Sequence, residues 1–173
     1  MTRTRLLAAA VLALVAVVVA VPVVAFVIVP QFVKSTVNEP APQARPPASV
    51  ASPGASPESM SATAPEVLAA GMLRRIDPVH YGSGQVQLVR VGDSRFLRFQ
   101  DVEIAGAPNM FVYLSDRGDG QPGRYTDLGA LKATNGSFNY EIPASVNLDS
   151  VRAVVVWCRA FSVTVTYAPV GKS

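Results

Sequence analysis

The sequence is poor in the residues that most often carry chemistry. Its 173 residues include one cysteine, Cys158, one histidine, His80, and one tryptophan, Trp157. One cysteine and one histidine cannot supply a zinc site of ordinary ligand number. There is no C-x-x-C pair for a dithiol couple, no C-x-x-C-H for covalent haem, and no glycine-rich phosphate loop. We therefore expect no metal site and no hydrolase or dehydrogenase. The sequence leaves at most a redox or electron-transfer activity.

The sequence also has little excess of one charge over the other. The formal net charge is +3, and Arg74-Arg75 is the only adjacent basic pair. A nucleic-acid surface needs clustered lysine and arginine to neutralise phosphates. The sequence therefore predicts that nucleic acid is not a partner.

One long apolar run is present, from Leu6 to Val29. A run of about two dozen residues is long enough to cross a hydrocarbon core of ~30 Å, and membrane helices tolerate an internal proline such as Pro22. Arg3 and Arg5 precede the run, so residues 1–5 are expected in the cytoplasm and the rest of the chain outside, anchored in the cell membrane by a single-pass helix over 6–29. The competing interpretation is a cleaved signal peptide, whose apolar core is shorter, ~7–15 residues.

Residues 30–65 are dominated by proline, alanine and serine and contain few large apolar side chains. Such a segment buries too little surface to offset the entropy of ordering it, so it is predicted to be a disordered, partly polyproline linker. At ~3.1 Å per residue, its ~35 residues would hold a domain up to ~100 Å from the membrane.

The remaining residues, 66–173, are organised around two strands near the end. Ala153 to Cys158 is a short valine-rich run typical of a buried strand. From Phe161 to Tyr167 the residues alternate, which places Phe161, Val163, Val165 and Tyr167 on one face and Ser162, Thr164 and Thr166 on a wetter one. Cys158 is expected at the end of the first of these strands, facing the interior.

Shorter apolar or alternating runs separated by turn residues precede this pair. With it they predict about seven or eight strands at intervals of roughly 8–12 residues, and no helix of useful length. Gly92-Asp93 and Asn135-Gly136 each predict a hairpin turn. The pattern favours an all-β fold, an antiparallel β-sandwich or jelly-roll-like domain of about 105 residues. The runs are Glu66–Leu73, which is either a helical turn or an edge strand, Gln85–Val91, Arg95–Gln100, Met110–Ser115, Leu128–Leu131 and Ser137–Ile142.

Cys158 admits two interpretations. A lone cysteine is often a small buried core residue, but an exported protein usually avoids an unpaired thiol, and such a thiol can react or ligate. Arg159 would lower its pKa if both side chains faced one pocket, although strand neighbours point to opposite faces. His80 is a distant candidate partner in a turn. The loop Asp116 to Asp127 carries acidic residues and an Arg-Gly-Asp triplet, which turn chemistry alone explains.

The order of these segments resembles the electron-transfer DM-thirteen domain, found in secreted bacterial proteins and in Skeletor-type animal surface proteins. The resemblance runs from about Val67 to Val170 and is carried by HYGSGQVQL, FLRFQDVEI, AGAPNMFVYLS, DLGALK, FNYEIP and VVVWCRAFSVTVTYAP. The last string, with Trp157, Cys158, Phe161 and Ala168, is the most specific. One departure is Asn109, which stands where an aspartate usually ends a glycine-proline-aspartate turn.

The resemblance implies a redox-active cysteine at Cys158, acting as a bare thiol or as a ligand to a prosthetic group such as haem, with His80 as a candidate cofactor contact. The chain is then expected to be a membrane-anchored electron-transfer module with a redox partner outside the cytoplasm. The alternative is a non-catalytic extracellular binding module in which Cys158 only packs.

Overall fold

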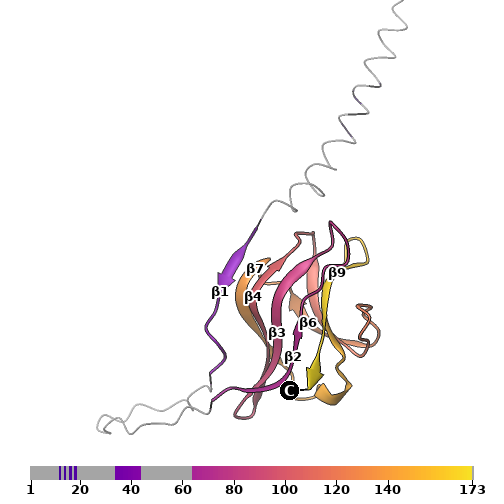
Figure 1. Cartoon of the computed structure of the whole chain (residues 1–173). Coiled ribbons are helices and arrows are strands. Elements are labelled where there is room, and N and C mark those ends of the chain that lie inside the picture. Colours follow the sequence, from indigo (N-terminus) through magenta and orange to yellow (C-terminus); the bar gives the residue numbers. More distant parts are fainter. Residues whose placement is uncertain are drawn as a thin grey trace, which may run out of the picture.

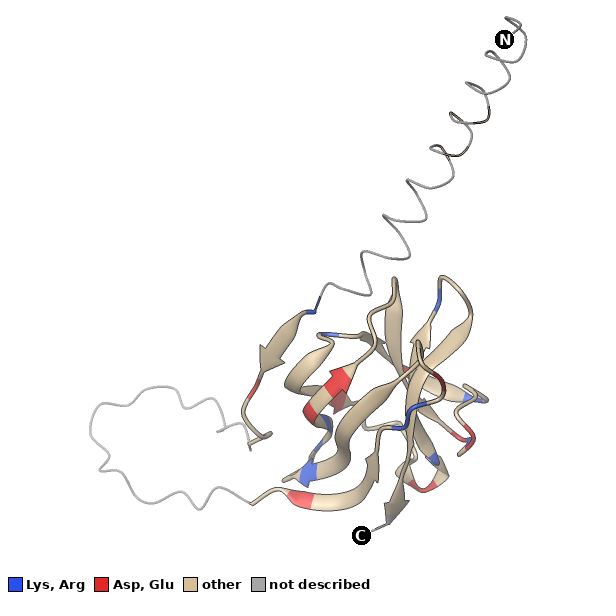
Figure 2. Ribbon diagram, turned by 45° about the horizontal axis from the view of Figure 1, so that its top comes forward, with Lys and Arg blue, Asp and Glu red and all other residues tan. Residues whose placement is uncertain are grey.

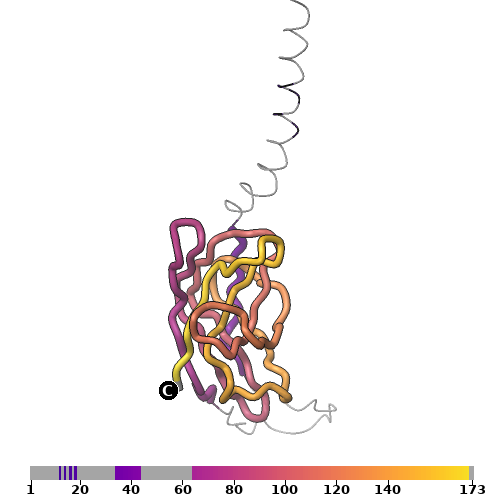
Figure 3. Tube along the Cα trace, turned by 90° about the vertical axis from the view of Figure 1, so that its right-hand side faces the viewer, coloured from indigo at the N-terminus to yellow at the C-terminus, as the bar shows by residue number. Residues whose placement is uncertain are grey.

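The computed structural model describes residues 34–43 and 64–172, together with four isolated helical positions, Leu12, Leu14, Ala16 and Val18. Residues 34–43 and 64–172 form two β-sheets that pack face to face (Figures 1 and 3), which confirms the predicted all-β sandwich. Within the described residues, no helix has the length and apolarity needed to span a membrane. The segments predicted at 1–5 and 6–29 otherwise lie outside the described residues.

The larger sheet has six strands in the order β1-β7-β4-β3-β2-β10, and the smaller has four in the order β6-β5-β8-β9. All pairs are antiparallel except β1 with β7, which is parallel. A 3-10 turn, Leu148–Ser150, precedes β8. The strand bounds are β1 Thr36–Asn38, β2 Glu66–Met72, β3 Gly82–Val91, β4 Ser94–Ile104, β5 Met110–Ser115, β6 Tyr125–Ala130, β7 Asn135–Ile142, β8 Ala153–Cys158, β9 Val163–Pro169 and β10 Gly171–Lys172.

The main core lies between the sheets. Side chains of the larger sheet, such as Leu97, Phe99 and Phe138, meet Val154 and Val156 of β8, and all five are fully buried. The rings of Phe99 and Phe138 stack with centroids 4.9 Å apart. The alternation of β8 sends its other side chains to the opposite face of the smaller sheet, where a second cluster forms around Tyr113, Ala153 and Val155.

The prediction of a linker over 30–65 is wrong for residues 34–43. Thr36, Val37 and Asn38 form β1 and pair with Asn135, Gly136 and Ser137 at the start of β7. Around this short strand, Ser35 exchanges hydrogen bonds with Thr134, and Glu39 accepts hydrogen bonds from the backbone and side chain of Asn139. The pairing and the two polar contacts offset the ordering entropy that the composition alone suggested would win.

Docking of β1 changes which part of the chain separates the domain from the residues before Lys34. Residues 44–63, which lie outside the described residues, connect two segments that are both held on the domain, Lys34–Gln43 and the chain from Ala64 onward. The length of that connection therefore does not set the distance between the domain and residues before Lys34. In the sequence, only residues 30–33 separate Lys34 from Val29, where the apolar run ends.

Asn135-Gly136 does not form the predicted hairpin turn but begins β7. Gly136 has φ +100°, and a Cβ at this position would overlap the carbonyl oxygen of Val37. The glycine thus lets β1 approach β7 closely. The glycine does adopt the positive φ that a hairpin turn would need, but it serves strand packing and forms no turn.

The alternation predicted for Phe161 to Tyr167 holds only in part. Val163 and Val165 face the main core, and Thr164 lies on the other face, where its hydroxyl donates to the carbonyl of Gly120 at 2.7 Å. A bulge between β8 and β9 then shifts the register, because Val156 pairs with Thr166 while Trp157 pairs with Thr164. After the extra residue, the side chains of β9 point to the faces opposite to those that strict alternation predicts, so Thr166 is fully buried and Tyr167 joins the second cluster. Phe161 lies in the turn before β9 and is exposed.

Candidate functional site

Cys158 is the last residue of β8 and pairs with Met110 of β5 and Val163 of β9. Its side chain belongs to the main core and has 0% exposure, as the alternation of Val154, Val156 and Cys158 predicts. The thiol donates a hydrogen bond to the carbonyl oxygen of Pro108, with Sγ and O 3.1 Å apart. The resting state of this site is thus a hydrogen-bonded, water-excluded thiol.

The carbonyl that receives this hydrogen bond belongs to the Pro108 turn, defined here as Ala105–Asn109. The turn is fixed at its two ends: the amide of Ala105 donates to the carbonyl of Tyr81 at 2.9 Å, and the carbonyl of Asn109 accepts from the amide of Arg159 at 3.0 Å. Asn109 has φ +56°, a left-handed conformation that asparagine tolerates better than most residues. Asparagine therefore keeps the turn geometry at the position where the family resemblance implied an aspartate.

Arg159 lies next to Cys158 in sequence but reaches the opposite face of the smaller sheet. Its Nε donates to the hydroxyl of Tyr113 at 2.7 Å, its guanidinium pairs with Asp127, and its Cζ lies 3.4 Å from the ring centroid of Phe111. The hydrogen bond to Tyr113, followed by the contact with Asp127, raises the pKa of Arg159. The guanidinium makes these contacts on the side of the sheet away from the thiol. Arg159 and Cys158 therefore do not share the pocket that activation of the thiol by Arg159 would need.

His80 is located in the loop between β2 and β3, where its Nδ1 lies 2.7 Å from Oδ2 of Asp77. The contacts from the side chain and backbone of His80 lower the pKa of Asp77. His80 lines a shallow groove of about 590 Å³ together with Trp157 and Tyr167, on the outer face of the smaller sheet. No hydrogen bond or ion pair of the described residues joins His80 to Cys158, so its role as a cofactor contact stays a prediction.

The acidic residues of the loop 116–127 form ion pairs with arginines. Asp116 pairs with Arg124 at 3.2 Å, Asp119 pairs with Arg117, and Asp127 pairs with Arg159. The described residues contain no group of three or more histidine, cysteine and carboxylate side chains placed to hold a metal ion. Basic and acidic residues are interspersed over the ribbon in the same way (Figure 2).

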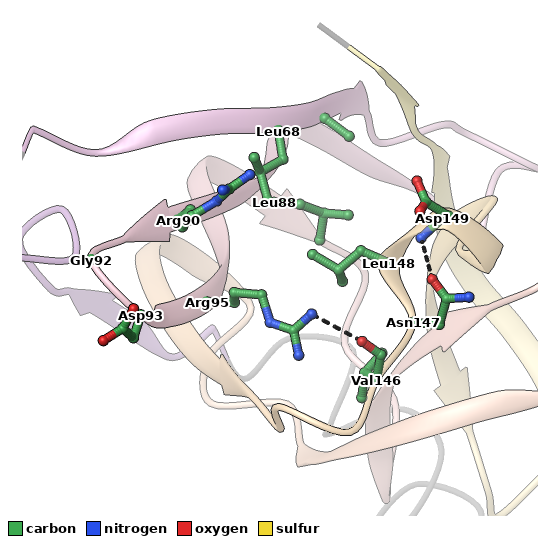
Figure 4. A pocket seen from close by; sticks show the side chains of 11 residues that line it. Leu68, Leu88, Arg90, Gly92, Asp93, Arg95, Val146, Asn147, Leu148 and Asp149 are labelled. Carbon is green, nitrogen blue, oxygen red and sulfur yellow. Dashed lines mark hydrogen bonds between the residues drawn. The ribbon is translucent and has the colours of Figure 1, made fainter.

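A second groove, of about 640 Å³, lies at the end of the sandwich that carries the β3–β4 turn at Gly92 (Figure 4). Cys158 is not among the residues that line it. Its two guanidinium groups are engaged. Arg95 donates to the carbonyls of Val146 at 3.0 Å and Pro143 at 2.7 Å, and Arg90 pairs with Glu66 at 3.4 Å. The groove therefore offers no free cation for an anionic ligand.

The residues do not fit a haem ligated by Cys158. The sulfur is packed in the main core with no exposed surface, and other side chains line the five best-formed grooves of the described residues. A porphyrin would need a cavity that opens onto Sγ. We therefore derive no chemistry through a prosthetic group at Cys158.

Three contacts at this site had no signal in the sequence. The carbonyl of Pro108 meets a sulfur 50 residues away, and Tyr113 and Asp127 meet Arg159 across 46 and 32 residues. Every residue has a backbone carbonyl, so the sequence cannot indicate which one accepts a hydrogen bond. Single tyrosine and aspartate residues are also common on strands and in turns. Only the fold brings these groups together.

Fold and site together define a class: a two-sheet β-sandwich with a single thiol buried beneath a short turn. The family described as Electron transfer DM13 matches residues 76–170, more than half of the chain. The chain therefore belongs to this family, as its resemblance predicted. No curated protein and no solved structure matches the chain.

Proposed function

We propose that this chain is a membrane-anchored electron-transfer module outside the cytoplasm, in which Cys158 is the reacting group. The family supports the electron-transfer role. The observation that carries the assignment to Cys158 is the position of the only thiol: it lies directly beneath the Pro108 turn, held by one hydrogen bond to a main-chain carbonyl. Residues 6–29 form the anchor in this proposal, with residues 1–5 in the cytoplasm and a redox partner outside it.

The reaction that suits a lone thiol is exchange with a disulfide of the partner. Opening of the Pro108 turn exposes Sγ, and the thiol loses its proton. The thiolate attacks one sulfur of the partner disulfide, the partner S–S bond breaks, a mixed disulfide forms, and the leaving sulfur takes up a proton. No further oxidant is needed, because the partner disulfide accepts the electron pair.

Complete burial of Cys158 favours a second candidate function. In that case the chain is a non-catalytic binding module outside the cytoplasm, and the cysteine is a core residue. The two functions differ in whether the folded protein exposes the thiol without unfolding.

The test is incubation of the folded, full-length chain in detergent micelles with oxidised glutathione, followed by intact-mass measurement. We expect a glutathione adduct that dithiothreitol removes, and none on the Cys158→Ser variant. An adduct that forms only in urea would contradict the redox function and support the binding module. The absorption spectrum of the same preparation should lack a Soret band, because there is no space for a haem at Sγ.

A further inference from the structure

One end of the sandwich, called here the β1 end, gathers loops that are far apart in the sequence. Gly82 pairs with Ile104, Glu103 with Asn135, and Asn135 with Thr36, so these strand ends lie at one edge of the larger sheet. The smaller sheet contributes the ends of β5 and β8, from which the turn 159–162 leads into β9. Figures 1 and 3 show the loop 73–81, the turn 159–162 and the start of β1 at this same end.

Exposed apolar side chains concentrate at the β1 end. Among residues 34–43 and 64–172, six large hydrophobic residues are exposed: Val67, Met72, Ile76, Val79, Tyr125 and Phe161. Met72, Ile76 and Val79 lie in or beside the loop 73–81, and Phe161 lies in the turn 159–162, with exposures of 46–58%. Val67 is near the start of β2 and Tyr125 begins β6, both toward the opposite end. Such a concentration on loop tips marks an interaction site.

Two arginines at this end lack an ion-pair partner among the described carboxylates; one carboxylate toward this end, Asp101, also forms no ion pair and accepts a hydrogen bond from the hydroxyl of Ser137 at 3.2 Å. Arg74 and Arg75 lie in the same loop, within 6.0 Å of the ring centroid of Tyr167 and 4.6 Å of that of Tyr81, and neither forms an ion pair with a described carboxylate. Three other carboxylates toward this end form ion pairs: Asp77 pairs with His80, Glu103 with Lys34, and Asp127 with Arg159. Apolar tips flanked by arginine are the composition of a surface that meets lipid headgroups.

The position of β1 brings this end close to the predicted membrane segment. Lys34 is fixed by Glu103 at 2.7 Å, and it stands five residues after Val29, where the apolar run ends. At ~3.3–3.6 Å per residue, five residues span at most ~18 Å. The headgroup region beyond the hydrocarbon core is itself ~5–8 Å deep on each side. An anchored chain therefore holds the β1 end at the bilayer surface.

We propose that the β1 end is a membrane-contact surface that binds the outer lipid leaflet of the bilayer in which the chain is anchored. Ile76, Val79 and Phe161 enter the headgroup region, Arg74 and Arg75 contact lipid phosphates, and docked β1 fixes this orientation. The inference rests on the proposed membrane anchor. It also places the Pro108 turn, and with it Cys158, on the membrane side of the domain.

The test uses the full-length chain reconstituted in vesicles of phosphatidylcholine and phosphatidylglycerol. A fluorescent nitrobenzoxadiazole label is attached to Phe161→Cys or Val79→Cys, in a Cys158→Ser background whose folding is checked by circular dichroism. Tyr125→Cys, 50% exposed beside 52% for both test positions, is the matched control. Doxyl-labelled lipids should quench the labels at 79 and 161 at least ~2-fold more than the label at 125, because only the β1 end meets the headgroups. Equal quenching at all three positions would overturn the proposal.

Carbonate extraction of the same vesicles separates this failure from failure of the anchor. A chain that alkaline carbonate releases lacks the proposed anchor, and the inference falls with it. A chain that is retained but not quenched at 161 keeps the anchor and refutes the contact surface. Gly136→Ala, which blocks β1 docking, should reduce quenching at 161 to the level of the control; unchanged quenching would refute the orienting role of β1.

Discussion

Among the described residues, the thiol of Cys158 and the carbonyl of Pro108 form the one polar contact of the buried sulfur, at 3.1 Å across 50 residues of sequence. The acceptor lies in a five-residue turn and the donor in the main core. Because β8 is held on both sides by β5 and β9, we expect access to the thiol to depend on opening of the turn.

Replacing Pro108 should speed reaction of the folded protein with a maleimide. Pro108→Ala loosens the turn by removing the fixed φ of proline, at a cost of about 0.4–1 kcal/mol in the closed state, which corresponds to roughly 2–5-fold faster labelling. Pro143→Ala, in the connector at the other end of the sandwich, is the control and should leave the labelling rate unchanged. Equal acceleration by both variants would show that the turn does not control access.

Truncation of Trp157 should cost less than truncation of a core aromatic residue. Its side chain is half-buried on the outer face, against the cluster of Tyr113 and Val155, so we expect Trp157→Ala to lower the free energy of unfolding by about 1–3 kcal/mol, below the 3–5 kcal/mol of a buried tryptophan. Val156→Ala, fully buried in the same strand, should cost about 2 kcal/mol. Urea denaturation measures both, and a loss above about 4 kcal/mol at Trp157 would contradict its placement.

Gly136 and Gly129 allow the docking of β1 to be tested separately from backbone strain. Both have positive φ, +100° and +104°, but an added Cβ meets Val37 and Asn38 at position 136 and nothing at position 129. Gly129→Ala should cost about 1–2 kcal/mol and leave β1 in place. Gly136→Ala should cost more and abolish hydrogen-exchange protection of the amides in 36–39. Retained protection in that variant would contradict the observed pairing.

Glu39 makes the docking of β1 sensitive to acid. Burial alone would raise the pKa of Glu39, but hydrogen bonds from Lys132 and Asn139 outweigh it and lower that pKa below 4.5. Because the pKa is lower in the folded state, the stabilisation of docked β1 is present above pH 4.5 and is lost as the pH falls through the folded pKa.

The amide shift of Asn139, which donates to Glu39 at 2.8 Å, reports this titration by NMR. We expect a midpoint below 4.5 and no titration in Glu39→Gln. A midpoint at or above 4.5 would show that the carboxylate is not held by Lys132 and Asn139.

The parts of the fold that could be predicted are those whose sequence signal is local. The apolar runs of β5 and β8 are continuous, and Met110–Ser115 and Ala153–Cys158 agree with the observed bounds. Alternation in β8 also predicts the inward direction of Cys158. The bulge opposite Trp157 depends on how β9 pairs with β8, so the faces of Thr166 and Tyr167 could not be inferred from β9 alone.

Strand β1 could not be predicted because its partners are distant. Thr36–Asn38 is too short for a periodic pattern and precedes a proline-rich stretch, while Glu39 meets Asn139 across 100 residues. The same limit applies to the site: the burial of Cys158 follows from its strand, but the Pro108 carbonyl above it and the partners of Arg159 follow only from the assembled sandwich.

The rate at which Cys158 of the folded chain reacts with a maleimide, measured against urea concentration well below the unfolding transition, tests the central claim most directly. Local opening of the Pro108 turn exposes little surface, so the redox function predicts a labelling rate that is nearly independent of urea in this range. A rate that rises with the full denaturant dependence of global unfolding would mean that the thiol is exposed only when the sandwich unfolds, and would contradict a reacting role for Cys158.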